Sequence, residues 1–255
     1  MKAVYVYSVI LAFINFPFVM AVESYAARLQ VKKVFAVDVA PGQRSREIRN
    51  SLLTTPVHAT LFLAALQSGF LRIASDTPPL VFASFLFALL WTEIWHYASH
   101  VAFHLRLLHF IHREHHESHL TGPWTSVSFS VVEKLIFSAG ILAGLALLSR
   151  LQPLSALGIF LYYTAYFFAN VLGHSNIEFR RPGYYGTFLG RIFNSPTYHS
   201  LHHARYFKNY GLLTPWLDNL FGTGWPDTAE IQSRVAGGKP LTRLGERLNR
   251  MRSGS

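Results

Sequence analysis

The sequence has no cysteine among its 255 residues. Disulfide frameworks, cysteine-ligated zinc, iron–sulfur clusters and thiolate-bound haem are therefore excluded, and cysteine usage gives no indication of the redox compartment. Charged residues are also scarce: they make up 14% of the chain, against roughly a quarter in soluble domains. Hydrophobic residues make up 51%. This composition is typical of an integral membrane protein.

Acidic residues are the scarcer of the charged ones. The chain has 13 of them against 23 basic residues, which leaves a formal net charge of +10. A basic excess is typical of proteins that bind nucleic acid or an anionic membrane surface. We favour the membrane, because the chain is so apolar and because its basic residues sort by membrane side rather than onto one groove-sized face. No nucleic-acid partner is expected.

Five stretches lack Asp, Glu, Lys and Arg and are candidates for membrane spans, each of which needs about 20 mostly apolar residues. We therefore predict an all-α integral membrane protein with four to five transmembrane helices. Two of the stretches are short and must extend into weakly polar neighbouring sequence. The stretches are residues 3–22, 50–71, 77–92, 135–149 and 151–177.

The loops between five such spans fall alternately on two sides. Residues 23–49, 93–134 and 178–255 share one side, which holds every basic residue except Lys2, Arg72 and Arg150. The positive-inside rule makes this side cytoplasmic. The first stretch resembles a signal peptide but is too long for one, so we expect a retained helix. Short loops favour the inner membrane of a bacterium.

Twelve of the 13 histidines fall on the predicted cytoplasmic side, eight of them between residues 96 and 119. On a helix leaving the membrane, His96, His100 and His104 would form one stripe. The pattern H-x-x-H-H occurs twice, and its three imidazoles converge on one helix face. Several such sets, together with His174 after the last span, would enclose two metal ions. The repeats are His112, His115 and His116, and then His199, His202 and His203.

A single histidine motif is more often structural, because isolated histidines commonly cap helices or pack in a core. Three motifs at the cytoplasmic ends of predicted spans favour a metal site instead. His109 and His119 do not fit the repeat, and the role of His96 stays open. His58, deep in a predicted span, either makes a hydrogen bond within the bundle or lines a substrate path. We favour the hydrogen bond.

An all-imidazole site suits iron, copper or zinc. The protease signature H-E-x-x-H is absent, and eight or nine ligands exceed the four of a structural zinc site. Imidazoles beside hydrocarbon favour a non-haem di-iron centre that activates oxygen against a C–H bond. Nearby carboxylates are expected to orient the ligands by accepting the second imidazole N–H. These carboxylates are Glu93, Glu114, Glu117 and Asp218.

From about residue 80 to residue 225 the motifs resemble the fatty acid hydroxylase and sterol desaturase superfamily. They are, in order, Glu93-x-x-x-Tyr97-x-x-His100-x-x-x-His104, His112-x-x-His115-His116, His174-Ser175-Asn176, the run from Ser195 to His203, and a closing signature from Asn209-Tyr210-Gly211 to Thr223. Two positions depart from the family pattern, since Val101 replaces the usual Arg and Glu93 replaces the usual Asp. Neither departure removes a ligand.

The resemblance implies a transmembrane bundle under a cytosolic helical cap that holds two irons, with zinc substituting in some crystals. It implies an enzyme that hydroxylates or desaturates a lipid, such as a fatty-acyl chain or sterol. Oxygen and two electrons are required, and a separate donor of the ferredoxin or small-cytochrome type would supply the electrons. His96 and Asn176 are expected to support the ligands. The implied ligands are His100, His104, His112, His115, His116, His199, His202 and His203, with His174 as a ninth.

Two other functions stay open, namely a metal transporter and a metal-binding membrane scaffold without oxygenase activity. A transporter needs ligands along its spans, near the midplane. The motifs divide the chain into an N-terminal helix and basic linker (residues 1–49), a catalytic domain (50–230) and a basic tail (231–255). Apolar residues at helical spacing predict either a surface amphipathic helix or a solvated segment in the tail. These residues are Leu241, Leu244, Leu248 and Met251.

Overall fold

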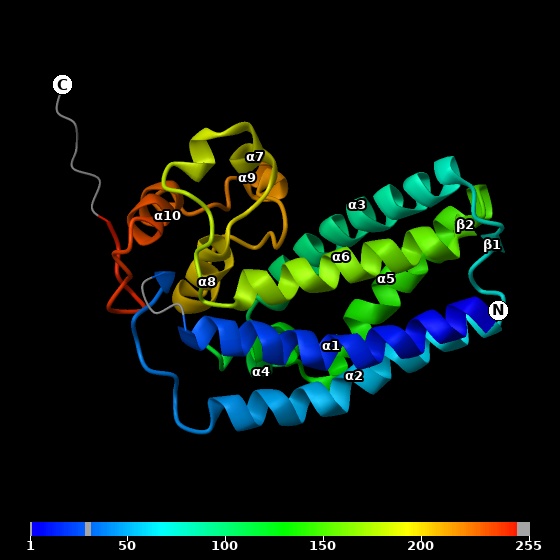
Figure 1. Ribbon diagram of the computed structural model, residues 1–255, viewed down its shortest axis with the longest axis horizontal. Helices are drawn as coiled ribbons and strands as arrows, with labels where there is room; N and C mark the ends of the chain where they lie inside the picture. Colours follow the sequence, from blue (N-terminus) through cyan, green and yellow to red (C-terminus); the bar gives the residue numbers. More distant parts are fainter. Residues whose placement is uncertain (1, 29–31, 249–255) are drawn as a thin grey trace.

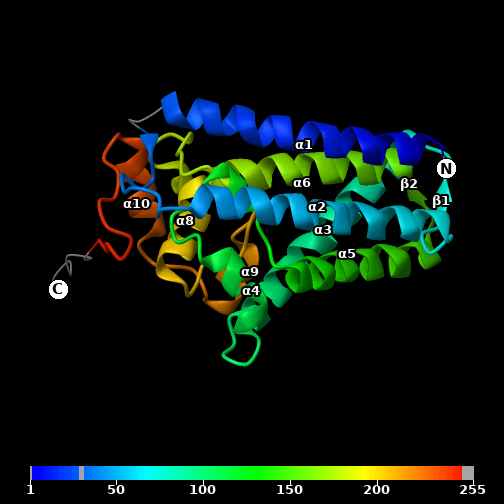
Figure 2. The same cartoon turned by 90° about the horizontal axis from the view of Figure 1, so that it is seen from below.

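Long helices lie side by side as a bundle, and shorter helices form a cap at one end of it (Figure 1, Figure 2). The structure is a computed structural model that describes residues 2–28 and 32–248. The long helices are α1 (Lys2–Arg28), α2 (Gln43–Gln67), α3 (Pro78–Phe103), α5 (Val131–Leu151) and α6 (Ala156–His174). The shorter ones are α4 (His109–His116), η2 (Pro123–Val127), η3 (Tyr184–Gly186), α7 (Phe188–Ile192), α8 (Pro196–Arg205), α9 (Trp216–Phe221) and α10 (Thr228–Ala236). The predicted all-α class is confirmed.

Three helices within the described residues are long and apolar enough to cross a membrane, namely α3, α5 and α6. They correspond to three of the five predicted spans. The predicted stretch 3–22 lies within α1, and most of 50–71 lies within α2, both of which run along the same bundle. As membrane spans, these two helices stay predictions. Exposed apolar side chains on α3 and α5 give the bundle a surface suited to lipid; examples are Phe82, Phe87, Leu90, Leu135 and Leu147.

Capping residues set helix ends that the apolar runs alone misplaced. The predicted span 151–177 is wrong at its start, because α5 continues to Leu151 and α6 begins only at Ala156. Pro153 interrupts the helix, since proline has no backbone N–H to donate. The Ser155 side chain then accepts from the backbone N–H of Gly158 and begins α6. Here strand β2 (Leu154–Ser155) pairs in parallel with β1 (Ile73–Ala74).

Close approaches hold α3 against its neighbours. A Cβ atom on Gly158 of α6 would lie 2.5 Å from the Val81 carbonyl of α3, so only glycine permits this contact. On the opposite flank, the indole N–H of Trp91 donates to the Gly140 carbonyl of α5 at 3.0 Å. Satisfying such a polar group on a neighbouring helix matters most where no water is present. Helix α3 is thereby fixed between α5 and α6, and it continues beyond the apolar stretch 77–92 to Phe103, so that the predicted helix carrying His96 and His100 is confirmed.

The cap includes chain segments from both ends of the sequence. The backbone N–H of Val34 donates to the Asn176 carbonyl. The N–H of Ala36 donates to the Leu241 carbonyl, and the N–H of Leu241 donates to the Val34 carbonyl. Leu241 is fully buried and packs in one cluster with Phe35, Leu201 and Ile231. Of the two alternatives for the tail, the amphipathic helix is wrong over residues 241–248, which form no helix, and the solvated segment is wrong at Leu241, which is buried against the cap. Met251 lies outside the described residues.

Candidate metal centre

The nine predicted ligands gather at the end of the bundle that carries the cap. Helix α3 positions His100 near its C-terminus, with His104 directly after it, and α6 ends on His174. The two H-x-x-H-H motifs form the short helices α4 and α8, as their spacing predicts. The nine imidazoles come from three separate parts of the sequence, namely residues 100–116, residue 174 and residues 199–203, and eight of them are buried.

The imidazoles form two groups, and within each group the candidate ligand atoms lie within 4.8 Å of one another. Each H-x-x-H-H motif is divided between the groups: its first and last histidines enter one group and its middle histidine enters the other. Both short helices thus contribute to both groups. The first group is His100, His104, His112, His116 and His202, and the second group is His115, His174, His199 and His203.

Most of these rings are oriented by a hydrogen bond at Nδ1, which leaves Nε2 to face the group centre. The acceptor is usually a backbone carbonyl, as in His100 to Tyr210 at 2.8 Å and His115 to Ser128 at 2.9 Å. Such bonds fix both the tautomer and the ring plane of a metal-binding histidine. The remaining carbonyl-bound rings are His174 with Asn170, His202 with Lys208, and His203 with Ser118.

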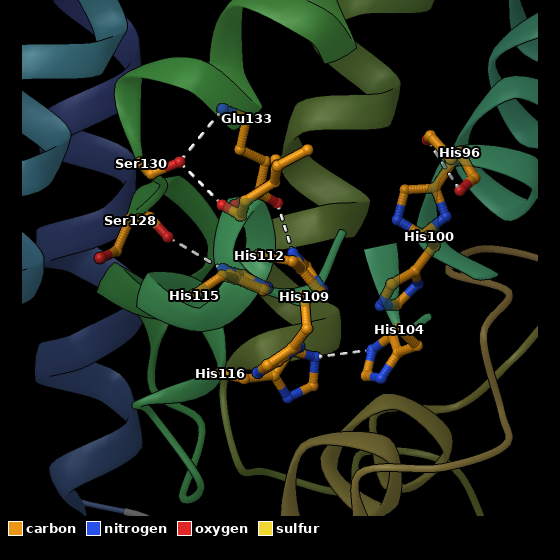
Figure 3. Close-up of polar contacts among 12 residues, drawn as sticks. His96, His100, His104, His109, His112, His115, His116, Ser128, Ser130 and Glu133 are labelled. Atoms are coloured by element: carbon orange, nitrogen blue, oxygen red, sulfur yellow. Dashed lines mark hydrogen bonds and ion pairs between the residues drawn. The ribbon is translucent and has the colours of Figure 1, made fainter. Parts of the chain in front are cut away.

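One ring is oriented by a carboxylate. Glu133 accepts from His112 Nδ1 at 2.6 Å, and both side chains are buried (Figure 3). Ser130, at the N-cap of α5, binds the backbone N–H of Glu133 and so fixes the start of that helix. This carboxylate–imidazole pair is the arrangement by which proteins raise the basicity of a metal ligand.

The Nε2 atoms approach one another more closely than neutral imidazoles allow by themselves. His174 and His203 donate through Nδ1, so their Nε2 atoms carry lone pairs. Both face Nε2 of His199, at 2.9 and 3.2 Å. One proton on His199 can serve only one of these contacts, so at least one pair of lone pairs meets directly. A cation among the three rings removes this repulsion.

The first group repeats the arrangement around His116, whose Nε2 lies 3.2 Å from that of His104 and 3.0 Å from that of His202. Nitrogens that bind one ion at about 2.0–2.1 Å lie roughly 2.8–3.4 Å apart for bond angles between 90° and tetrahedral. The observed separations fall in this range. The residues present therefore fit one metal ion in each group.

Burial keeps the imidazoles outside the membrane helices neutral. It lowers the pKa of His115 to about 4 and that of His104 to about 2, because the charged form loses its hydration. Neighbouring imidazoles lower the pKa further in the rest of the cluster, which comprises His112, His116, His199, His202 and His203. Since only a neutral imidazole binds metal, the site is ready for metal near neutral pH.

The carboxylates that the sequence predicted as ligand-orienting groups accept no imidazole N–H within the described residues. Glu93 instead binds the backbone N–H and hydroxyl of Thr214, Glu114 binds Asn50, and Glu117 pairs with Arg46 at 3.3 Å. That part of the prediction is wrong, because proximity in sequence did not place these side chains beside the rings.

Two other predicted supporting residues act on backbone rather than on rings. Asp218 accepts the backbone N–H groups of Tyr210 and Gly211, and the Tyr210 carbonyl in turn accepts from His100. Asn176 binds the backbone of Phe35 on both sides, which attaches the N-terminal linker to the end of α6. Asp218 thus affects a ligand through one loop.

The remaining histidines lie outside the two groups. His96 packs edge-on against His100 with ring centroids 5.0 Å apart, His109 contacts the Tyr206 hydroxyl, and His119 is exposed. His58 Nδ1 lies 2.7 Å from the Ser138 hydroxyl, so the predicted hydrogen bond within the bundle is confirmed.

A cavity lies between the histidine groups and the adjoining ends of α3, α5 and α6. We call it the metal-side cavity. Histidines of both groups line it, including His100, His112, His115, His174 and His199. Its other walls are largely apolar or aromatic, with Phe103, Phe129, Phe137, Tyr166 and Leu212. Such a cavity presents an apolar molecule to both histidine groups at once.

The chain has a histidine cluster that can bind metal at one end of a bundle with three membrane-capable helices. These two features define it as a membrane protein with a histidine-rich metal site. Comparison with known families agrees. Residues 85–223 match the fatty acid hydroxylase family, which is more than half of the chain. The chain belongs to that family, and the resemblance noted in the sequence is confirmed.

Curated relatives include the very-long-chain aldehyde decarbonylase GL1-7 of Oryza sativa subsp. japonica, which is 32% identical over 158 residues. GL1-4 of Oryza sativa subsp. indica is 34% identical over 136 residues, and Protein CER1-like 2 of Arabidopsis thaliana is 32% identical over 136. The matches cover 51–59% of this chain but 22–24% of the relatives, so the chain spans about a quarter of their length. No solved structure matches. These relatives are plant proteins, and the bacterial origin stays a prediction.

Proposed function

We propose that this chain is a membrane enzyme that uses two histidine-bound iron ions, O2 and two electrons to oxidise a C–H bond of a lipid. The observation that carries the proposal is the convergence of nine imidazoles into two groups around one cavity that faces the apolar bundle. Two ions beside a hydrocarbon-lined cavity suit oxidation of an apolar substrate better than hydrolysis. The predicted cytoplasmic position of the cluster is part of the proposal.

Bound iron would supply the redox chemistry that activates oxygen. The chain's own side chains have separate tasks. Phe103, Phe137 and Leu212 exclude water and orient an alkyl chain in the metal-side cavity. Glu133 and the carbonyls at Nδ1 hold the rings in position before a substrate or metal binds.

The substrate is proposed to enter from the bilayer between the helices. Fatty-acyl chains and sterols follow from the family, and the names of the relatives add very-long-chain aldehydes. Product chemistry separates the remaining options, since oxygen insertion gives an alcohol and loss of a second hydrogen gives an alkene.

A separate electron donor is proposed to dock on the cap. Exposed basic side chains surround the histidine end of the molecule, among them Arg106, Arg113 and Arg191. A positive surface attracts an acidic protein and raises its association rate at low ionic strength. A ferredoxin or a small cytochrome has the required charge.

The test uses substitutions that remove one ligand from each group. His115→Ala affects the second group and His202→Ala affects the first, whereas exposed His119→Ala is the matched control. Each variant is purified, loaded with iron, and given reductant, 18O2 and a panel of lipids. We expect about two irons per wild-type or H119A chain, fewer in H115A and H202A, and labelled alcohol or a new alkene only from the first two proteins.

One result would contradict the proposal. Unchanged lipid from wild-type protein that holds its full iron complement, with an active electron donor, would exclude oxygenase activity. If metal removal then unfolds the cap, the metal-binding scaffold is supported instead. Transport is disfavoured by position, because both histidine groups gather at one end of the bundle rather than along α3, α5 and α6.

A further inference from the structure

A second cavity lies deeper in the bundle and adjoins the metal-side cavity. We call it the bundle cavity. The two cavities share four lining residues, which are Phe129, Phe137, Tyr166 and Asn170. Beyond them the bundle cavity extends between α2, α5 and α6, where His58, Lys134 and Tyr163 line it. A molecule in the bundle cavity is therefore separated from the histidine-lined cavity by these shared side chains alone.

The bundle cavity contains hydrogen-bond donors that lack an acceptor. Lys134 Nζ makes no ion pair or hydrogen bond with the described side chains, and its only close partner is the Phe129 ring at 4.8 Å. The Tyr166 hydroxyl is buried without a partner. His58 uses Nδ1 for Ser138, while its buried Nε2 has no partner. In the tautomer in which the Ser138 hydroxyl donates to Nδ1, His58 Nε2 carries a proton and is a third donor.

An unpaired phenol and an unpaired ammonium in an apolar bundle are costly, and ionisable residues at such positions commonly mark a functional site. A metal ion cannot satisfy them, because a cation repels the lysine ammonium. The donors require an oxygen acceptor; Asn15 Oδ1, an unpaired acceptor that also lines the cavity, is neutral, whereas the ammonium favours a negatively charged acceptor. A carboxylate supplies two acceptor oxygens and the missing charge.

The position of the Lys134 ammonium relative to the metal centre follows from two contacts of the Phe129 ring. Lys134 Nζ lies 4.8 Å from the Phe129 ring, which stacks on the His115 ring at 4.8 Å and an interplanar angle of 4°. The ammonium is thus less than about 10 Å from the centre of a candidate ligand. An acceptor held by Lys134 places the neighbouring carbons, rather than the far end of a long chain, beside the histidines.

We propose that Lys134, His58 and Tyr166 bind the carboxylate of a single-chain fatty acid, so that the carbons near this polar end lie in the metal-side cavity. The inference rests on the proposed function for its substrate role and goes beyond it by naming the head group and the region of the chain that reacts. Oxidation near the carboxylate is the chemical consequence.

The binding test needs neither oxygen nor electrons. Octadecanoic acid, its methyl ester, octadecanal and octadecane are titrated into metal-loaded protein in nanodiscs under anaerobic conditions, with wild type, Lys134→Met and Lys134→Arg. A charge-assisted hydrogen bond corresponds to about a ten- to hundredfold change in Kd. We expect a loss of that size for the acid in K134M, recovery to within a few-fold in K134R, and no change for octadecane in any variant.

Exposed Lys239→Met is the matched control, and we expect it to bind the acid like wild type. His58→Phe and Tyr166→Phe should each weaken acid binding several-fold without changing the metal content. Should K134M fail to fold, the wild-type preference for the acid over its methyl ester decides the question. Equal affinity for acid and ester, or acid binding unaffected in K134M, would overturn the inference. A normal acid preference without turnover would instead contradict only the proposed function.

Discussion

The contact between Glu133 and His112 predicts that one substitution weakens one of two metal ions. His112 belongs to the first histidine group, and among the described residues Glu133 makes no hydrogen bond to a ring of the second. Glu133→Gln keeps the size of the side chain and an acceptor oxygen but removes the negative charge 2.6 Å from the imidazole Nδ1. The ring therefore becomes a weaker base and a less firmly oriented ligand, while the second group keeps its carbonyl acceptors.

The magnitude follows from comparable carboxylate–histidine–metal arrangements, where loss of the outer partner weakens metal binding about 10- to 100-fold. This corresponds to about 1.4–2.7 kcal/mol at 25 °C. Since four more imidazoles hold the first ion, we expect weaker binding rather than its complete loss. The second ion should retain its wild-type affinity.

Competition with a chelator, followed by elemental analysis, measures the two affinities. Compared with wild type, E133Q should release one ion at about 10- to 100-fold lower chelator concentration and the other ion at an unchanged concentration. Glu93→Gln is the matched control, because Glu93 is also a buried carboxylate of a membrane helix but binds Thr214. Equal weakening of both ions in E133Q, or equal effects of E93Q and E133Q, would refute the reasoning.

Three further substitutions test the fold through the thermal unfolding of the solubilised protein. Arg205→Met leaves Asp227 without its bonds of 2.7 and 2.9 Å, and should cost about 3–5 kcal/mol of unfolding free energy; an unchanged midpoint would contradict this. Gly158→Ala puts a Cβ 2.5 Å from the Val81 carbonyl, so α3 and α6 must separate at a cost of about 1–3 kcal/mol. Burial raises the pKa of the Glu47 carboxyl above its ordinary value of 4.5, so the folded state binds the carboxyl proton more tightly than the unfolded chain does. The free energy of unfolding therefore falls as the pH rises above 4.5. Glu47→Gln should flatten this pH dependence, and an equally steep profile in E47Q would argue against it.

Much of the site could be predicted because its ligands are side chains of one type at helical spacing. The H-x-x-H-H repeat fixes which rings share a helix face, and apolar runs fix which helix ends lie near them. Both signals are local in sequence. The helices α4 and α8 confirm the first, and the positions of His100 and His174 at the ends of α3 and α6 confirm the second.

The partners of the rings were not predictable in the same way. Most of them are backbone carbonyls, and a carbonyl has no residue type to recognise. Glu133 did carry a signal, since it is an acidic residue in the first turn of a predicted apolar helix, next to Lys134. Such an acid either faces a polar group or pays a large desolvation cost. Choosing carboxylates by distance in sequence from the histidines overlooked it.

The division of each H-x-x-H-H motif between the two groups has a consequence for assembly. On α4, His112 and His116 enter the first group and His115 enters the second; on α8 the assignment is reversed. Neither group is complete until both helices are in place, because each helix supplies ligands to both groups. A change that displaces α4 or α8 as a whole should therefore weaken both metal sites, whereas loss of a contact that orients a single ring, such as that between Glu133 and His112, should weaken only one. The two kinds of change are thus distinguishable by the number of ions that they release.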